Sequence, residues 1–385
     1  MIYLDNNATT RMAADVVQAM APFWREQYGN ASSQHHMGQA ARHAVDGARE
    51  QVAGLVGARS REIVFTSGGT EANNLAIQGT LSAYPKKRRI VTTAVEHPAV
   101  HRLCQRLETQ GYDVTYVSVN SAGHLDLDAF RHALDDETAL ASVMHANNET
   151  GVIFPIREIS EITAARSVPL HVDTVHTLGK LDLDVAALGA NMLSFSAHKM
   201  HGPKGVGGLY VRRGTRLRSP FAGGHQEFDL RPGTENVAAI VGFGAAAELA
   251  GKRLEKDGPS AIAAMRNRLE SGILERISIA HVIGDCMRRT VNTTCIGFER
   301  LEAEALLIAL SEAGLCASSG SACSSGSLEP SHVLKAMSID EHVAHGAVRF
   351  SLSHETTEEE VDQALEMIPR MVTRLSSVGM RSSQD

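Results

Sequence analysis

The feature that most constrains the fold is a repeated alternation, from about residue 32 to residue 255, of short β-branched runs with stretches of helical period. Apolar residues recur at helical spacing between the runs, as from Ala44 to Val56. Such alternation is typical of a mostly parallel sheet with helices between its strands. We therefore predict an α/β fold with seven strands, at residues 63–65, 90–93, 114–119, 140–144, 170–172, 192–195 and 208–211.

The pattern changes after about residue 255, which predicts a second, smaller α+β domain. A chain of 385 residues is long enough for two hydrophobic cores. We place the large domain at residues 13–255 and the small one at residues 1–12 and 256–385. The elements expected in the small domain are helix 261–275, strands 281–283 and 294–298, helix 302–312, strand 348–352 and helix 357–372.

Charge and hydropathy exclude several classes of partner. The formal net charge is −7, whereas a protein that binds nucleic acid gathers Lys and Arg against the phosphates. No window approaches the roughly 18 consecutive apolar residues of a membrane span. The first residues show no basic leader followed by an apolar run. We expect a cytoplasmic protein with neither a nucleic acid nor a membrane as partner.

A lysine among small residues is the first candidate for chemistry. Residues 194–199 read Ser-Phe-Ser-Ala-His-Lys, and a glycine-rich run follows at 202–208. A lysine that forms a Schiff base needs space around it and a lowered pKa, and small neighbours provide the space. For most lone lysines a surface position at the end of a strand is the better explanation, and Lys204 is expected to be such a residue or a structural contact.

Two further segments could hold a charged cofactor. Asp173 ends an apolar strand, where a carboxylate can face a protonated pyridine nitrogen or simply cap a helix. Residues 66–74 contain two glycines where a strand ends and a helix begins. The N–H groups of such a turn, with the Thr70 hydroxyl, suit a phosphate, although Gly-Gly-Thr is more often only a tight turn.

Several motifs together resemble the cysteine desulfurases of the class V aminotransferase group, and most closely their nitrogen-fixation and housekeeping iron–sulfur-cluster branch. The resemblance covers nearly the whole chain and implies a pyridoxal 5'-phosphate (PLP)-dependent transferase of fold type I. It implies a homodimer that converts L-cysteine to L-alanine and passes the sulfur, through a cysteine persulfide, to an iron–sulfur scaffold or another acceptor protein. The motifs lie at residues 3–10, 95–100, 147–151, 194–199, 231–236, 318–323, 327–334 and 345–352.

The same resemblance assigns roles to residues of this chain. Lys199 would hold PLP as a Schiff base, and Asp173 would pair with the ring nitrogen. His97 and Val175 would cover the two faces of the ring, and His97 or the substrate thiol would take the proton of the attacking cysteine. The remaining contacts would be Gly69, Thr70, Ser196 and His198 at the phosphate, Thr234 reaching in from the partner subunit, Asn148 beside cofactor and substrate, and Arg349 with Asn30 at the substrate carboxylate.

One position departs from the family pattern. His176 stands where the family usually has a Gln that hydrogen-bonds the phenolic oxygen of the cofactor. A neutral imidazole can donate the same bond, whereas a protonated imidazole would shift the pH optimum.

Cys323 is the expected sulfur acceptor. It lies in a Gly/Ser-rich stretch at 318–327 without apolar periodicity, and such a loop can swing between a cofactor and the surface of a partner. The resemblance also implies contact between Cys323 and a nascent iron–sulfur cluster on a partner. The other cysteines show no CxxC spacing and are expected to be mostly buried and inert; they are Cys104, Cys286, Cys295 and Cys316.

Other functions remain open on the same scaffold. Selenocysteine lysis and transamination are enzymatic alternatives, although transamination needs no thiol on a loop. A non-catalytic scaffold is a third alternative, and the presence of Lys199, Asp173 and Cys323 argues against it. Because His198 and His201 lack a third ligand in the sequence, no metal site is expected.

Overall fold

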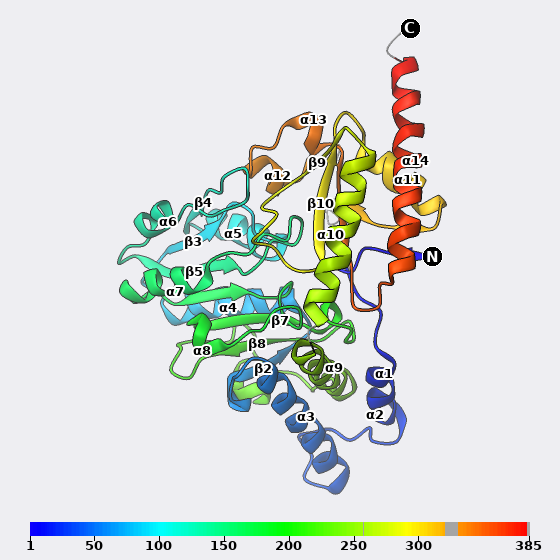
Figure 1. Cartoon of the computed structure of the whole chain (residues 1–385). Coiled ribbons are helices and arrows are strands. Elements are labelled where there is room, and N and C mark those ends of the chain that lie inside the picture. Colours follow the sequence, from blue (N-terminus) through cyan, green and yellow to red (C-terminus); the bar gives the residue numbers. More distant parts are fainter. Residues whose placement is uncertain (257, 320–329, 383–385) are drawn as a thin grey trace.

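A central seven-stranded sheet organises the computed structural model, which describes residues 1–256, 258–319 and 330–382 (Figure 1). The strand order is β2-β8-β7-β6-β5-β3-β4. Neighbours from β7 to β4 are parallel, whereas β8 is antiparallel to both β7 and β2. All seven predicted strands are confirmed, as β2 (Ile63–Thr66), β3 (Arg89–Thr93), β4 (Asp113–Val117), β5 (Thr138–Met144), β6 (Leu170–Asp173), β7 (Met192–Ser196) and β8 (Gly207–Val211).

Helices cover both faces of this sheet. Consecutive residues of a strand point to opposite faces, and here both faces carry apolar side chains that need to be buried. Val64 and Ile90 pack under α4 (Gly69–Ala83) and α5 (Pro98–Thr109). Their neighbours Phe65 and Val91 belong to the opposite core. That core includes residues of α3 (His36–Leu55), α6 (Leu127–Ala133), α7 (Ile156–Ala165), α8 (Val185–Leu188) and α9 (Val237–Glu255).

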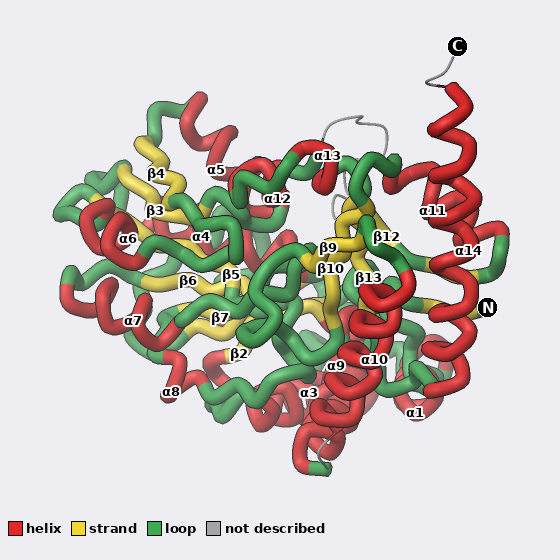
Figure 2. The backbone as a smooth tube through the Cα atoms, turned by 45° about the horizontal axis from the view of Figure 1, so that its top comes forward, coloured by secondary structure: helices red, strands yellow, loops and turns green. Residues whose placement is uncertain are grey.

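The C-terminal part of the chain builds a second sheet, in the order β12-β13-β10-β9 (Figure 2). The N-terminal strand β1 (Ile2–Tyr3) pairs in parallel with β11 (Leu315–Cys316) beside it. Ile2 and Leu4 share an apolar core with α10 (Gly258–Arg276), α11 (Ala303–Glu312) and α14 (Glu358–Ser382). The strands are β9 (Ala280–Val282), β10 (Thr293–Phe298), β12 (Ser318–Ser319) and β13 (Ala347–Ser351).

Several short elements complete the described chain. Helix α14 is longer than the predicted 357–372, and the two-residue strands and shortest helices have no sequence signal of their own. The boundaries predicted for the two domains stay a prediction. No helix in the described ranges is long and apolar enough to cross a membrane. The elements not yet named are α1 (Ala14–Met20), α2 (Pro22–Arg25), α12 (His332–Ala336) and α13 (Glu341–Ala344).

A buried ion pair attaches the segment before α9 to the sheet. Both terminal nitrogens of Arg49, on α3, donate to the Glu227 carboxylate, at 2.6 and 2.7 Å. Glu227 also accepts from the backbone N–H of Phe65 on β2, at 2.7 Å. Because both side chains are buried, the loss of either partner leaves an uncompensated charge in the interior.

We therefore predict that Arg49→Leu lowers the free energy of unfolding by about 3–5 kcal/mol, measured by urea denaturation. Lys252→Ala is the control, because Lys252 forms an exposed pair with Glu248 on the same helix and its loss should change the stability far less. An Arg49 variant no less stable than this control would show that the buried pair does not anchor the segment.

Candidate active site

The predicted site residues gather at the carboxyl edge of the central sheet, where neighbouring parallel strands end together. Asp173 is the last residue of β6, and Lys199 follows β7 in a short 3₁₀ turn, Ala197–Lys199. Gly69 begins α4 shortly after β2, and His97 caps α5 after β3. Asn148 follows β5. The structure thus brings together residues that lie up to 130 positions apart, from Gly69 to Lys199.

The amine of Lys199 lies against the N-terminal segment. Its Nζ donates to the main-chain oxygens of Asn7 and Ala8, the latter at 2.8 Å. Asn7 is buried, and its own Nδ2 donates to Thr293 Oγ1 at 2.9 Å and to the main-chain oxygen of Asn148 at 3.2 Å. Sequence reasoning missed Asn7, and only its place in the motif at residues 3–10 could have pointed to it.

The Asp173 carboxylate is buried and oriented from two sides. One oxygen accepts from the N–H of Val175 at 3.0 Å, and the other from Asn73 Nδ2 at 2.7 Å. Asn73, on α4, is a second functional candidate that sequence reasoning missed. A buried carboxylate held in one orientation by neutral donors suits a cationic partner such as a protonated ring nitrogen.

Gly69 lets Val175 approach the start of α4 more closely than any larger residue would. A Cβ at this position would lie 2.6 Å from Val175 Cγ2 and 3.6 Å from Ser196 Cβ. Gly69, Val175 and Ser196 therefore lie together, and their role at a cofactor stays a prediction. Helix α4 starts here without a side-chain cap, so its first N–H groups can meet a phosphate.

His97 is held as a neutral imidazole. Its Nδ1 accepts from the N–H of Ala99 at 3.1 Å, which places the ring proton on Nε2. Burial lowers the pKa of His97; the charge of Asp173 acts in the opposite direction, and Lys199 adds to the lowering. A neutral ring with one donor nitrogen can take up or pass on a proton.

Two buried polar atoms near Lys199 have no hydrogen-bond partner among the described residues: His176 Nδ1 and Asn148 Oδ1. Burial, and then the positive charge of Lys199, lowers the pKa of His176 well below its usual value, so this ring is neutral. Of the two forms of His176 that the sequence left open, neutral and protonated, the structure therefore favours the neutral imidazole. Unpartnered buried atoms are costly unless a ligand meets them.

Arg349 lies on β13 and is buried. Its guanidinium donates to Asp5 Oδ1 and to the main-chain oxygen of Asn148, both at 2.9 Å. Its Nε has no hydrogen-bond partner among the described residues. Asp5 was not among the predicted site residues. A substrate carboxylate at Arg349 would therefore share the guanidinium with Asp5.

Cys323 lies outside the described residues, but both flanks of its segment can be placed. On one side Ser318 of β12 is the register partner of Arg349. On the other side Ser331 Oγ donates to Glu149 at 2.6 Å, and His332 Nε2 lies 2.9 Å from the Glu96 oxygen, next to His97. The two ends of the segment therefore flank the site. Of the other cysteines, Cys104 and Cys295 are buried as predicted, whereas Cys286 is exposed.

Three predicted contacts are not assembled in the single chain. Asn30 is exposed, and its hydrogen bonds are local, to the N–H groups of Ser32 and Ser33. His198 Nδ1 lies 3.1 Å from Thr9 Oγ1. Thr234 is exposed in a surface hollow that Thr70 also lines. Their predicted roles stay predictions.

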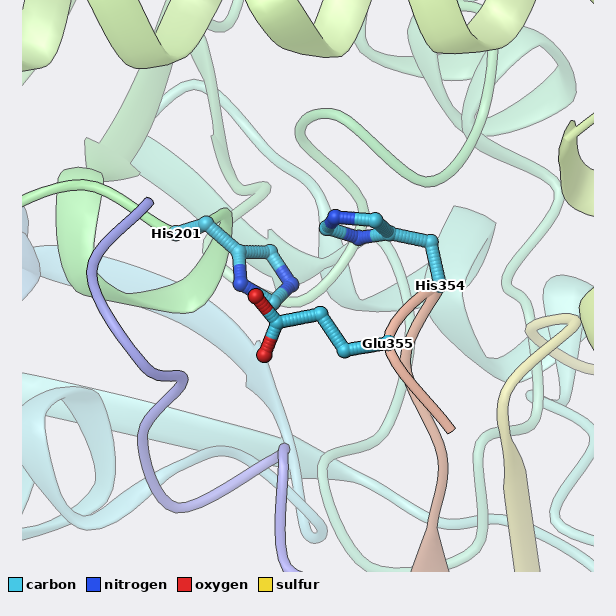
Figure 3. A group of neighbouring side chains, drawn as sticks. All are labelled: His201, His354 and Glu355. Carbon is cyan, nitrogen blue, oxygen red and sulfur yellow. The ribbon is translucent and has the colours of Figure 1, made fainter. Parts of the chain in front are cut away.

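His201 lies beside His354 and Glu355 (Figure 3), whereas the sequence had suggested His198 as its possible partner in a metal site. Each of the three offers a ligand atom within 4.8 Å of the others. Two cations already lie at this group: Arg253 Nη1 is 3.5 Å from His354 Nε2, and Arg11 Nε is 3.9 Å from Glu355. These contacts favour a polar link between segments over a metal site.

The chemistry of the described residues fits PLP. Asp173 can face the ring nitrogen, and the N-terminus of α4, which starts at Gly69, can face the phosphate. His176 Nδ1 and Lys199 Nζ are nitrogens that can meet the remaining polar groups of the cofactor.

The chain is similar to known proteins over nearly its whole length. The family model for aminotransferase class V matches residues 2–364. A protein named cysteine desulfurase from Nostoc sp. strain PCC 7120 is 52% identical over 98% of this chain and 94% of its own length. Cysteine desulfurase NifS from Azotobacter vinelandii is 48% identical over 98% of this chain and 94% of its own length.

Solved structures are similar as well. A NifS-like protein superimposes with a TM-score of 0.91 at 38% identity, over 97% of this chain and all of the other. A structure titled SspA in complex with cysteine has a TM-score of 0.81 at 33% identity, over 93% of this chain and all of the other.

The buried carboxyl group of Glu96 has a raised pKa, which makes the stability of the protein depend on pH. It is fully buried beside His97, and its Oε1 accepts from Thr93 Oγ1 at 2.7 Å and from the N–H of Met144 at 2.9 Å. Burial raises its pKa to about 8, and the negative charge of Asp173 adds to this. A carboxyl group whose pKa is higher in the folded than in the unfolded protein, where it is about 4.3, contributes its full stabilisation at a pH below that unfolded-state pKa. This contribution is lost as the pH rises toward the folded-state pKa, about 8.

We therefore predict that Glu96→Gln gains stability relative to the parent protein between pH 5 and pH 8, by about 2–4 kcal/mol in urea denaturation. Exposed Glu50→Gln is the control and should show no such trend. A difference between Glu96→Gln and the parent that does not change with pH would mean that Glu96 is ionised in the fold.

Proposed function

Since the chain belongs to the class V aminotransferases, and within them to the cysteine desulfurases, we propose that it removes the sulfur atom of L-cysteine, releases L-alanine and receives the sulfur on Cys323 as a persulfide. The observation that carries this proposal is the position of Lys199 beside Asp173 and His97, with both flanks of the Cys323 segment at the same site.

The proposed cofactor is PLP. Lys199 would bind it covalently, Asp173 would face its ring nitrogen, and His97 and Val175 would cover its faces. When bound, PLP withdraws electrons from an amino acid joined to it, so that the α-proton becomes acidic and the carbon–sulfur bond can break. Gly69, Thr70, Ser196 and His198 are proposed at the phosphate, and His176 and Asn148 at the remaining polar groups.

Residues of the chain hold the substrate and move its protons. Arg349 would bind the carboxylate of L-cysteine, because a guanidinium matches a carboxylate in two hydrogen bonds. Asn30 is proposed beside it. The free amine of Lys199 can accept the α-proton at Nζ and return it. His97, which carries its ring proton on Nε2, can donate it in a hydrogen bond to a thiolate sulfur, whereas taking up a proton would require Nδ1 to release its bond from the Ala99 N–H.

Sulfur transfer requires the thiolate form of Cys323. Its lone pair attacks the sulfur of L-cysteine, so that a sulfur–sulfur bond forms and the carbon–sulfur bond breaks. The electron pair of the broken bond stays with the carbon, which takes up a proton and becomes the methyl group of L-alanine. The terminal sulfur of the persulfide then passes to a thiol of the acceptor.

We further propose that the protein is a cytoplasmic homodimer that supplies an iron–sulfur scaffold or another acceptor protein. The hollow that Thr70 and Thr234 share is also lined by the exposed Phe221. An exposed aromatic side chain beside a charged hollow is typical of an interface between subunits. A partner subunit could therefore present its own Thr234 to the phosphate.

We predict that Cys323→Ser keeps the visible absorbance of bound PLP but releases sulfide from L-cysteine only at the background rate, because a hydroxyl is a far weaker nucleophile than a thiolate. The assay measures sulfide and alanine in the presence of a reductant. Cys286→Ser is the matched control, since Cys286 is an exposed cysteine elsewhere on the chain, and it should keep full activity. Undiminished sulfide release by Cys323→Ser would assign the acceptor role to another thiol.

A further inference from the structure

The guanidinium proposed to bind the substrate carboxylate is already paired with a carboxylate of the chain itself. Arg349 Nη2 donates to Asp5 Oδ1 at 2.9 Å, and the two side chains are 3% and 19% exposed. Salt in the solvent screens a buried pair much less than a pair on the surface. The charge of Asp5 therefore acts on any ligand that Arg349 binds.

Asp5 is fixed at this position by the main chain on both sides of it. It follows strand β1 and forms an isolated parallel bridge with Ser351, the last residue of β13. The N–H of Ser351 donates to the Leu4 oxygen at 2.7 Å, and the N–H of Asn6 donates to the Ser351 oxygen at 3.1 Å. Because Arg349 lies on the same strand as Ser351, the backbone keeps the carboxylate and the guanidinium together.

Part of the guanidinium stays open to a ligand. Nη1 of Arg349 donates to the main-chain oxygen of Asn148 at 2.9 Å and Nη2 donates to Asp5, whereas Nε is buried and has no hydrogen-bond partner among the described residues. A guanidinium carries five N–H groups, so donors remain for a second carboxylate. The positive charge, however, is already matched by Asp5.

A second carboxylate at Arg349 would lie close to the negative charge of Asp5. Like charges repel, and the repulsion is stronger in a buried site than in water. L-Cysteine and L-alanine carry the same carboxylate, so Arg349 would bind the substrate and the product through one group. An interaction that is equally strong for both lowers KM without speeding the chemical step, and it slows the release of the product.

We propose that Asp5 is a positioning residue with two effects on Arg349: it holds the guanidinium in place, and its charge weakens the binding of the carboxylate that L-cysteine and L-alanine share, so that L-alanine leaves sooner. This inference rests on the proposed function, in which Arg349 binds the substrate carboxylate. Loss of the charge at residue 5, with the hydrogen bond to Arg349 kept, should therefore make the binding of both amino acids tighter.

The test adds L-alanine to the protein with bound PLP and measures binding from the change in visible absorbance. Asp5→Asn removes the charge but keeps an oxygen that can accept from Arg349. Its dissociation constant for L-alanine should fall about fivefold, because a nearby like charge is gone. L-Alaninamide, whose carboxamide is neutral, should bind equally well to Asp5→Asn and to the parent protein. Asp15→Asn removes an exposed carboxylate on α1 and is the control.

Turnover provides a second readout of the same variant. In Asp5→Asn, KM for L-cysteine should fall by a similar factor, whereas kcat should not rise, because the changed interaction is common to substrate and product. A KM that rises instead would mean that Asp5 serves only to orient Arg349, and this result would overturn the proposal.

The outcomes of the binding test separate the possible explanations. An Asp5→Asn variant that binds L-alanine as weakly as the parent protein, or more weakly, overturns the proposal. Equal tightening of L-alanine and L-alaninamide also overturns it, because the charge of Asp5 does not repel a neutral carboxamide. If Asp5→Asn does not fold, Asp5→Ser takes its place in the same comparison. A parent protein with bound PLP that binds neither L-alanine nor L-cysteine would instead refute the proposed function on which this inference rests.

Discussion

The arrangement of the active-site residues depends on the hydrogen bonds of Asn7, a buried residue in the N-terminal segment. Its N–H donates to Ser351 Oγ at 2.9 Å, its Nδ2 donates to Thr293 Oγ1 and to the Asn148 oxygen, and its side-chain and main-chain oxygens accept from Lys180 and Lys199, respectively. A buried polar group that loses its partner is costly, so these bonds specify where strands β10 and β13 meet the edge of the central sheet. One residue therefore links the C-terminal sheet to the amine of Lys199.

Around this link, the site combines positive groups with neutral imidazoles. Lys180, Lys199 and Arg349 bring positive charge to a buried space, whereas burial keeps His97 and His176 mostly uncharged. Such surroundings favour anionic ligands, such as a phosphate or a carboxylate, and they lower the pKa of neighbouring amines. The Asp173 carboxylate provides the local negative charge that a cationic ring would need.

Much of this could be predicted from sequence, because the strands of the central sheet carry clear apolar runs and the predicted residues follow where those strands end. Lys199, Asp173 and Gly69 lie as expected for that reason. Asn7, Asn73 and Asp5 could not be found this way, since their roles arise from contacts between segments far apart in the chain. The pairing of His201 with His354 and Glu355 has the same origin, and so does the position of Lys180.

The most direct test of the account is to locate the sulfur after a single turnover. The protein with bound PLP is mixed with one equivalent of L-cysteine without reductant, alkylated and mapped by peptide mass spectrometry. The account predicts one additional sulfur atom on the peptide that contains Cys323, together with one equivalent of alanine. An additional sulfur on the Cys286 or Cys316 peptide instead, or alanine formed without any sulfur bound to the protein, would contradict it.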